Sequence, residues 1–203
     1  MKWRLVLTCL SVLLLSGCVS PVDIANSTVW VNGVGSGTVV RVERIGDIDQ
    51  VCILTAAHVL RPPLAEVTFM FRDPRWGLMY DMRSMTGYIA VHDTMTDVGI
   101  IVVPLERGLA HARKVARMPP RLGERLIVSG YPKGTYMLTQ GTCSGYSYGK
   151  FITTADVDGG SSGGGVYNSR MELVGVMTNI GPAMSGKFSP IFRADVEDYI
   201  RNR

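Results

Sequence analysis

The segment DGGSSGGGVYN, residues 158–168, has the composition of a flexible tether, because five glycines and two serines fill positions 159–165. A strand-like run follows at once and continues through Tyr167. Glycine also adopts backbone dihedrals that other residues reach only at a cost, and a turn that presents two N–H groups to one oxyanion needs such dihedrals. The segment is therefore either a linker or a rigid turn, and the rest of the sequence has to decide.

The rest of the chain is rich in short runs of β-branched residues, interrupted by Gly, Pro and Asp, and has almost no helical periodicity. Runs of this kind with frequent turn residues are typical of an all-β barrel or sandwich. We predict strands at 28–31, 37–44, 51–55, 67–71, 87–91, 98–103, 125–130, 137–143, 151–154, 164–167, 173–178 and 190–193.

A seam divides these strands into two groups of six, because residues 106–123 are poor in β-branched residues and contain Pro119-Pro120. We expect two six-stranded antiparallel barrels, at about 27–105 and 124–194, joined by a linker at about 106–123. A helix is expected at about 195–203, where apolar residues recur at helical spacing after an N-cap at Asp195.

The first 17 residues have the layout of a secretory signal, with Lys2 and Arg4 before an apolar run at 5–15 and then small residues. The run is shorter than the roughly 20 apolar residues that span a bilayer. Residues 15–18, LSGC, resemble the lipobox of bacterial lipoproteins, in which cleavage before the Cys leaves a Cys that carries lipid. The resemblance implies that 1–17 are removed and that the mature chain 18–203 is tethered to a membrane through Cys18.

A lipoprotein of this kind lies in the bacterial cell envelope. Val19 follows the Cys where lipoproteins retained in the inner membrane carry Asp, which favours the outer membrane, facing the periplasm. An ordinary signal peptide with an unrelated Cys is the alternative.

The net charge bears on nucleic-acid binding, and the cysteine content bears on disulfide formation. Loss of Lys2 and Arg4 lowers the formal net charge from +4 to +2, and the remaining basic residues are scattered, so nucleic-acid binding is not expected. The densest basic stretch, residues 107–121, is interpreted as a solvated loop. Cys52 and Cys143 remain in the mature chain, either as a disulfide or as free thiols, of which Cys52 lies in an apolar run.

Three segments supply chemistry. Of the three histidines, His58 follows an apolar strand in TAAHVL, whereas His92 and His111 are interpreted as surface residues. In TDVGIIVV, Asp97 stands immediately before an apolar strand, where a carboxylate can orient an imidazole. Asp93 is a rival that lies farther from the strand.

The glycine-rich turn offers a nucleophile. Ser162 has Gly160 two positions before it and Gly163 directly after it, and a strand follows. TAAHVL, TDVGIIV and GSSGGGV, in the order His, Asp, Ser, resemble the signature segments of trypsin-like serine proteases of the chymotrypsin fold. The bacterial branch with short loops, which includes the HtrA-type proteases, is most similar. GVGSGTVV and LVGVMT resemble two further strands of that family, so that the resemblance covers roughly residues 33–193.

The resemblance implies a serine endopeptidase that acts on protein or peptide substrates and needs no metal or organic cofactor. His58 would be the general base, Asp97 would orient it, and Ser162 would be the nucleophile. The backbone N–H groups of Gly160 and Ser162 would form the oxyanion hole. Ser161 is excluded as the nucleophile because no Gly follows it.

The sequence says less about which substrate residue the enzyme would prefer before the scissile bond. By the family's pattern Thr178, Asn179 and Ile180 border the pocket for the residue before the scissile bond. Asp156, six positions before Ser162, stands where trypsin carries its pocket Asp, which would favour Lys or Arg; a solvated turn is the alternative. The rival function is a catalytically silent lipoprotein that uses the same fold to bind peptides or envelope proteins.

Overall fold

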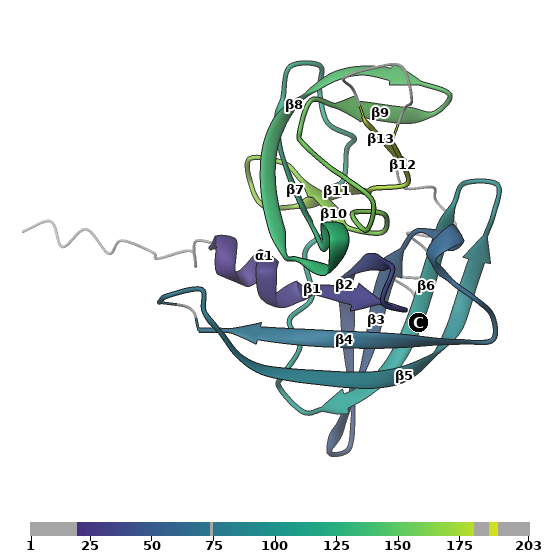
Figure 1. Cartoon of the computed structure of the whole chain (residues 1–203), viewed down its shortest axis with the longest axis vertical. Helices are drawn as coiled ribbons and strands as arrows, with labels where there is room; N and C mark the ends of the chain where they lie inside the picture. Colours follow the sequence, from purple (N-terminus) through teal and green to yellow (C-terminus); the bar gives the residue numbers. More distant parts are fainter. Residues whose placement is uncertain (1–19, 74, 181–186, 191–203) are drawn as a thin grey trace, which may run out of the picture.

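A computed structural model describes residues 20–73, 75–180 and 187–190 of the chain. Two lobes lie one above the other in Figure 1, with the strands up to β6 in the lower lobe and the strands from β7 in the upper lobe. The predicted all-β architecture is confirmed.

The first lobe is a closed barrel with the strand order β1-β2-β3-β6-β5-β4. It closes because β1 pairs with β4 as well as with β2. Its strands are β1 (Thr28–Val31), β2 (Gly35–Ile45), β3 (Ile48–Thr55), β4 (Leu64–Arg72), β5 (Met79–Asp93) and β6 (Val98–Glu106).

Strands β3 and β6 are apolar on both faces, which explains the unbroken hydrophobic runs at 51–54 and 100–103. On β3, Val51 and Ile53 belong to the core inside the barrel. Cys52 and Leu54, on the opposite face, pack in a second core that includes Leu173 of the upper lobe. The two lobes are therefore joined by a hydrophobic layer, and their relative position is set by packing.

The second lobe is a curled sheet with the order β11-β10-β7-β8-β9-β13-β12. Its strands are β7 (Arg125–Gly130), β8 (Met137–Ser147), β9 (Lys150–Thr153), β10 (Gly165–Tyr167), β11 (Leu173–Val176), β12 (Asn179–Ile180) and β13 (Lys187–Pro190). The expected six-stranded barrel is thus a seven-stranded sheet among the described residues, because the strand predicted at 173–178 is broken. Met177 donates its N–H to Gly164 and accepts from the N–H of Gly163, and this pairing with the glycine-rich turn separates β11 from β12. β11 and β12, the two edge strands of this sheet, are therefore consecutive in the sequence.

A short helix, α1 (Pro21–Ser27), precedes β1 and was not predicted. Its start carries a capping box, in which Ser20 accepts from the N–H of Asp23 and the Asp23 carboxylate accepts from the N–H of Ser20. Two 3-10 turns, Ala57–Val59 and Pro132–Gly134, complete the elements. The helix expected at 195–203 and the strand residues 191–193 lie outside the described residues. Among the residues that are described, no helix has the length and apolar character needed to cross a bilayer.

The segment between the lobes is partly packed, unlike the solvated loop expected for 107–121. Leu173 donates its N–H to Lys114 and accepts from the N–H of Ala116, and Ala110 and Ala116 are buried. Cys52 and Cys143 are buried free thiols in different cores, and burial raises the pKa of each. The disulfide alternative is therefore wrong for this structure.

Candidate active site

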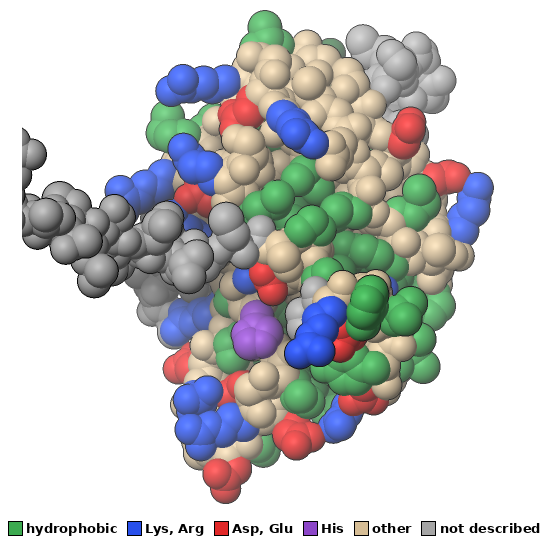
Figure 2. Space-filling view, turned by 90° about the vertical axis from the view of Figure 1, so that its left-hand side faces the viewer, with side chains coloured by type: hydrophobic (Ala, Val, Ile, Leu, Met, Phe, Trp, Pro, Cys, Tyr) green, Lys and Arg blue, Asp and Glu red, His purple; other side chains and the backbone are tan. Residues whose placement is uncertain are grey.

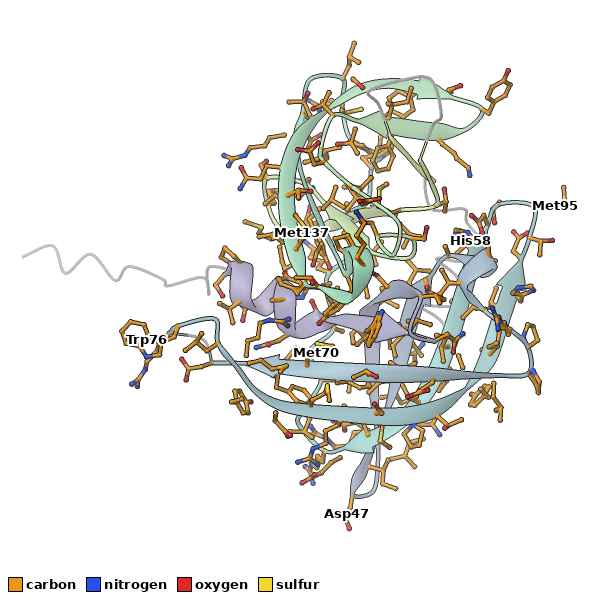
Figure 3. All side chains as sticks on the ribbon, viewed as in Figure 1. Asp47, His58, Met70, Trp76, Met95 and Met137 are labelled. Atoms are coloured by element: carbon orange, nitrogen blue, oxygen red, sulfur yellow. The ribbon has the colours of Figure 1, made fainter. Side chains whose placement is uncertain are left out.

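His58 lies in the 3-10 turn that follows β3. Ala56 and Ala57, directly before it, are fully buried, whereas about half of the His58 side chain is exposed (49%). The apolar strand thus ends against the core, and the tight turn directs the imidazole outward. Figure 3 shows His58 at the end of the first barrel that faces the second lobe.

Asp97 holds both the backbone and the ring of His58. One carboxylate oxygen accepts the His58 backbone N–H at 2.9 Å, and the two oxygens lie 2.8 Å and 3.0 Å from His58 Nδ1. Asp97 has a left-handed backbone (φ 60°), and its carbonyl accepts the N–H of Ala57 at 3.2 Å. The contact at Nδ1 leaves Nε2 as the ring nitrogen that can exchange a proton with another group.

The rival residues have other contacts. Asp93 accepts the backbone N–H groups of Met95 and Thr96, so its carboxylate shapes the turn before β6. His92 Nε2 lies 3.1 Å from the carbonyl oxygen of Ala57, behind the His58 turn. His111 is exposed.

Two N–H groups of the glycine-rich turn have no acceptor among the described residues. Gly159 donates to the Asp158 side chain, Ser161 to the Asp158 carbonyl, Gly163 to Met177 and Gly164 to Ser161. Within the described parts of the chain, no acceptor takes the N–H of Gly160 or of Ser162. These are the two groups assigned to an oxyanion hole by the resemblance.

The peptide between Gly159 and Gly160 is oriented by Lys133. The Lys133 backbone N–H donates to the Gly159 carbonyl at 2.8 Å. Because C=O and N–H point in opposite directions across a trans peptide, the Gly160 N–H points away from Lys133. Gly160 has φ 96°, and a Cβ there would lie 2.4 Å from the Tyr131 carbonyl oxygen, so only glycine fits. The Lys133 ammonium also pairs with the Asp158 carboxylate at 2.6 Å, and both side chains are largely exposed.

Ser36, which the sequence did not single out, connects this turn to the first barrel. Its N–H donates to the Ser162 carbonyl at 2.7 Å, and its hydroxyl donates to the Gly160 carbonyl at 2.7 Å. The same hydroxyl accepts the Tyr131 N–H at 2.8 Å, and the Ser36 carbonyl accepts from the Thr55 hydroxyl at 2.6 Å. Ser36 is fully buried. The only signal in the sequence is a small polar residue between two glycines at the start of β2.

Close backbone packing brings the histidine turn and the serine turn together. A Cβ on Gly35 would lie 2.5 Å from the Val59 side chain and 3.1 Å from the Ser162 carbonyl oxygen. Gly35 is therefore the point at which the neighbour of His58 and the backbone of Ser162 converge. No hydrogen bond joins the Ser162 hydroxyl to His58 among the described residues. Such bonds are often long before substrate binds.

The residues predicted for the specificity pocket have different surroundings in the structure. Asp156 is exposed and lines a cavity of about 480 Å³ together with Val157, Asp158 and residues of the 132–137 segment. Thr178 is buried, and its hydroxyl accepts from Lys150 Nζ at 3.1 Å. Asn179 and Ile180 form β12, of which the backbone alone is described. No group of three or more His, Cys, Asp or Glu side chains suited to a metal ion occurs among the described residues.

Comparison with known proteins shows the family of the chain. Residues 35–176, most of the chain, match the model of the trypsin-like peptidase domain. The chain belongs to that family. The matched region of this trypsin-like peptidase domain contains His58, Asp97 and Ser162.

A solved structure supports the fold. The crystal structure of the serine endoprotease from Yersinia pestis resembles this peptidase domain with a TM-score of 0.67 and 20% sequence identity, covering 90% of this chain and 68% of that one. The fold is therefore chymotrypsin-like, as expected from the sequence. No curated protein matches the chain significantly.

Proposed function

We propose that the chain is a serine endopeptidase that cleaves peptide bonds through His58, Asp97 and Ser162. The observation that carries the proposal is the pair of N–H groups on Gly160 and Ser162, which have no acceptor among the described residues, whereas the N–H groups of Gly159, Ser161, Gly163 and Gly164 are all bonded. Both residues are half-buried, and backbone N–H groups withdrawn from solvent are usually paired with protein, with water or with a ligand. A developing oxyanion is such an acceptor.

In the proposed reaction, the Ser162 hydroxyl attacks the substrate carbonyl while His58 Nε2 takes its proton. The new C–O bond forms as the carbonyl π electrons move to oxygen, and the N–H groups of Gly160 and Ser162 stabilise the resulting negative charge. Asp97 stabilises the imidazolium through Nδ1. His58 then gives its proton to the leaving amine, which leaves an acyl-enzyme on Ser162. Water, deprotonated by His58, hydrolyses the acyl-enzyme and restores the hydroxyl.

Labelling with a fluorophosphonate tests this function directly, because the probe phosphonylates an activated serine. We expect the wild type to label and Ser162→Ala to remain unlabelled. Ser161→Ala is the matched control, since Ser161 is the buried neighbour in the same turn and accepts from the N–H of Asp158. Equal labelling of wild type and Ser162→Ala, or labelling of neither, would favour a catalytically silent peptide-binding protein.

Limited proteolysis tests whether residues 159–165 form a rigid active-site turn or a flexible linker. A turn held by Met177, Asp158 and Ser36 should resist limited proteolysis in the native protein. Cleavage within 159–165 that leaves two stable fragments would support the linker interpretation instead.

Specificity for Lys or Arg before the scissile bond is proposed on the basis of Asp156. Its carboxylate is exposed beside a cavity large enough for a long side chain, in a segment that leads to the oxyanion turn. Asp156→Asn should reduce kcat/KM for a peptide with Lys at that position and leave a peptide with Ala unchanged. Equal loss on both peptides would indicate a structural role.

We further propose that the enzyme is lipid-anchored at Cys18 in the bacterial envelope, at the outer membrane facing the periplasm. The LSGC segment supports this proposal. Cys18→Ala should lower the fraction of the protein that is bound to membranes, or stop its maturation. Unchanged membrane association in the variant would contradict the anchor.

A further inference from the structure

The hairpin formed by β4 and β5 extends beyond the first barrel. Strand β4 pairs with β1 only at residues 67–69, and β5 pairs with β6 only at residues 88–93. Residues 70–72 and 79–82 are therefore paired with each other and with no third strand in the described structure. In Figure 1 this end of the hairpin reaches out beside α1, on the left of the view.

The end of this hairpin, residues 75–82, exposes large apolar side chains. The exposed fractions are 77% for Trp76, 70% for Leu78 and 69% for Tyr80, and Met79 and Met82 are more than half exposed. Single exposed apolar residues are ordinary on a soluble protein, but five within eight positions concentrate exposed apolar surface at this end of the hairpin, on both of its faces, and such a concentration is typical of an interaction site. We call these five residues the hairpin patch.

The turn that carries the hairpin patch is well ordered by hydrogen bonds. The Asp73 carboxylate accepts the N–H groups of Arg75 and Trp76, and the Asp73 N–H donates to the Leu78 carbonyl. Gly77 takes the left-handed conformation that the turn needs (φ 67°). Figure 3 shows Trp76 projecting away from the body of the molecule, so its exposure is a property of the folded hairpin.

Helix α1 is fixed to the base of the same hairpin. The Asn26 side chain donates to the Arg72 carbonyl at 3.0 Å and accepts the Arg72 N–H at 2.7 Å, and the Arg72 guanidinium lies 4.1 Å from the centre of the Tyr136 ring. The helix begins at Pro21, three residues after Cys18. By chain length alone Cys18 is within about 11 Å of Pro21, since a residue spans at most about 3.6 Å.

We propose that the hairpin patch inserts into the interfacial region of a lipid bilayer, next to the anchored end of the chain. Trp and Tyr favour that region because each has an apolar ring and a polar group. Acidic and basic side chains around the patch balance, with Asp73 and Asp81 against Arg75 and Arg83, so the binding is driven by apolar insertion and not by lipid charge. Figure 2, which faces this side, shows hydrophobic side chains gathered among both kinds of charge.

The choice of a lipid bilayer as the partner of the hairpin patch rests on the proposed lipid anchor at Cys18. Two points of attachment, a lipid chain and the hairpin patch, would fix the orientation of the domain on the membrane. Trp76 and His58 lie at opposite sides of the molecule in Figure 3. His58 would then lie on the side of the molecule that faces away from the bilayer, toward substrates in solution.

Quenching of Trp fluorescence by brominated phosphatidylcholine vesicles tests the contact, because bromine quenches only an indole that lies within the bilayer. The chain contains Trp3, Trp30 and Trp76, so Trp76→Phe identifies the residue responsible. We expect vesicles to quench the wild-type emission and Trp76→Phe to lose most of that quenching. Equal quenching of the two proteins, or none, overturns the proposal.

Flotation with vesicles measures the contribution of the patch without the lipid anchor. It uses the mature chain 18–203 with Cys18→Ser, because the apolar run at 5–15 would itself bind vesicles. Adding Leu78→Ser and Met79→Ser should lower the vesicle partition coefficient at least about tenfold. Met118→Ser with Leu122→Ser is the matched control, because these linker residues are as exposed, at 74% and 72%, and should leave partitioning unchanged.

The other outcomes contradict bilayer insertion. Equal loss in both double variants would show that general hydrophobicity drives binding. Binding only to phosphatidylglycerol vesicles, and its loss in salt, would show that electrostatic attraction to anionic lipid drives the binding. A dimer in light scattering that the Leu78 and Met79 changes dissociate, without quenching, would identify a second copy as the occupant. Fluorophosphonate labelling should be the same in all these variants, so failure of the peptidase proposal is detected separately.

Discussion

Ser36→Ala is the most informative single change, because one buried hydroxyl connects the two lobes at the oxyanion turn. The hydroxyl donates to the Gly160 carbonyl and accepts the N–H of Tyr131, a residue with no exposed surface. Removal leaves a buried donor and a partly buried acceptor without partners. At about 1–3 kcal/mol for the first and about 1 kcal/mol for the second, the free energy of unfolding should fall by about 2–4 kcal/mol.

For a domain of this size the change corresponds to a decrease in Tm of roughly 5–15 °C. The rate of reaction at Ser162 should also fall, because the carbonyl of Gly160 loses the hydrogen bond that holds it in position. A correctly placed oxyanion donor contributes roughly 3–4 kcal/mol, so partial misplacement should slow fluorophosphonate labelling at least about tenfold.

The assay combines thermal unfolding, followed by circular dichroism, with the labelling rate at a temperature where both proteins are fully folded. Ser84→Ala is the control, because its hydroxyl makes one hydrogen bond, to Thr68, at an exposed position and should change the free energy of unfolding by less than about 0.5 kcal/mol. A Ser36→Ala protein with wild-type Tm and labelling rate would refute the role assigned to Ser36.

Three further changes test other parts of the site and fold. Asp97→Asn should lower the turnover of a peptide substrate about 10⁴-fold with little change in Tm, since the side chain keeps its shape but loses the charge that stabilises His58; steady-state kinetics and unfolding measure the two effects. Lys133→Met should leave Tm almost unchanged, because the ion pair with Asp158 is exposed. It should slow fluorophosphonate labelling, because the pair holds Asp158 next to the oxyanion turn. The pKa of Glu172 is held at about 2 by Lys114, Asn168 and Arg170, below its ordinary 4.5, so its contribution to stability is present above pH 4.5 and is lost as the pH falls toward 2. Tm of the wild type should therefore decrease more steeply than that of Glu172→Gln over this pH range, and parallel curves would contradict the assignment.

Much of the fold was predictable from local pattern. β1 and β7 have the predicted bounds, and the strands of the closed first barrel follow from short runs of β-branched residues bounded by turn residues. The first half of β5, residues 79–86, was missed because its mixed polar and Met sequence pairs only with β4 and packs little against the core. Helix α1 was missed because seven residues are too few for a periodic signal, although its capping box is present.

The sequence by itself determined the all-β class, the order of His58, Asp97 and Ser162, and the need for glycine around Ser162. The fold class and the need for glycine follow from the β-strand preference of β-branched residues and from the dihedral preference of glycine, which are local properties, and the order of the three residues is read directly from the chain. Only the tertiary structure decided which N–H groups of the turn are free, because their possible acceptors, such as Met177, come from other strands. The same reason hid Ser36, whose hydroxyl bonds residues about a hundred positions away. The glycine-rich segment that resembles a tether is a hydrogen-bonded turn because of these distant partners.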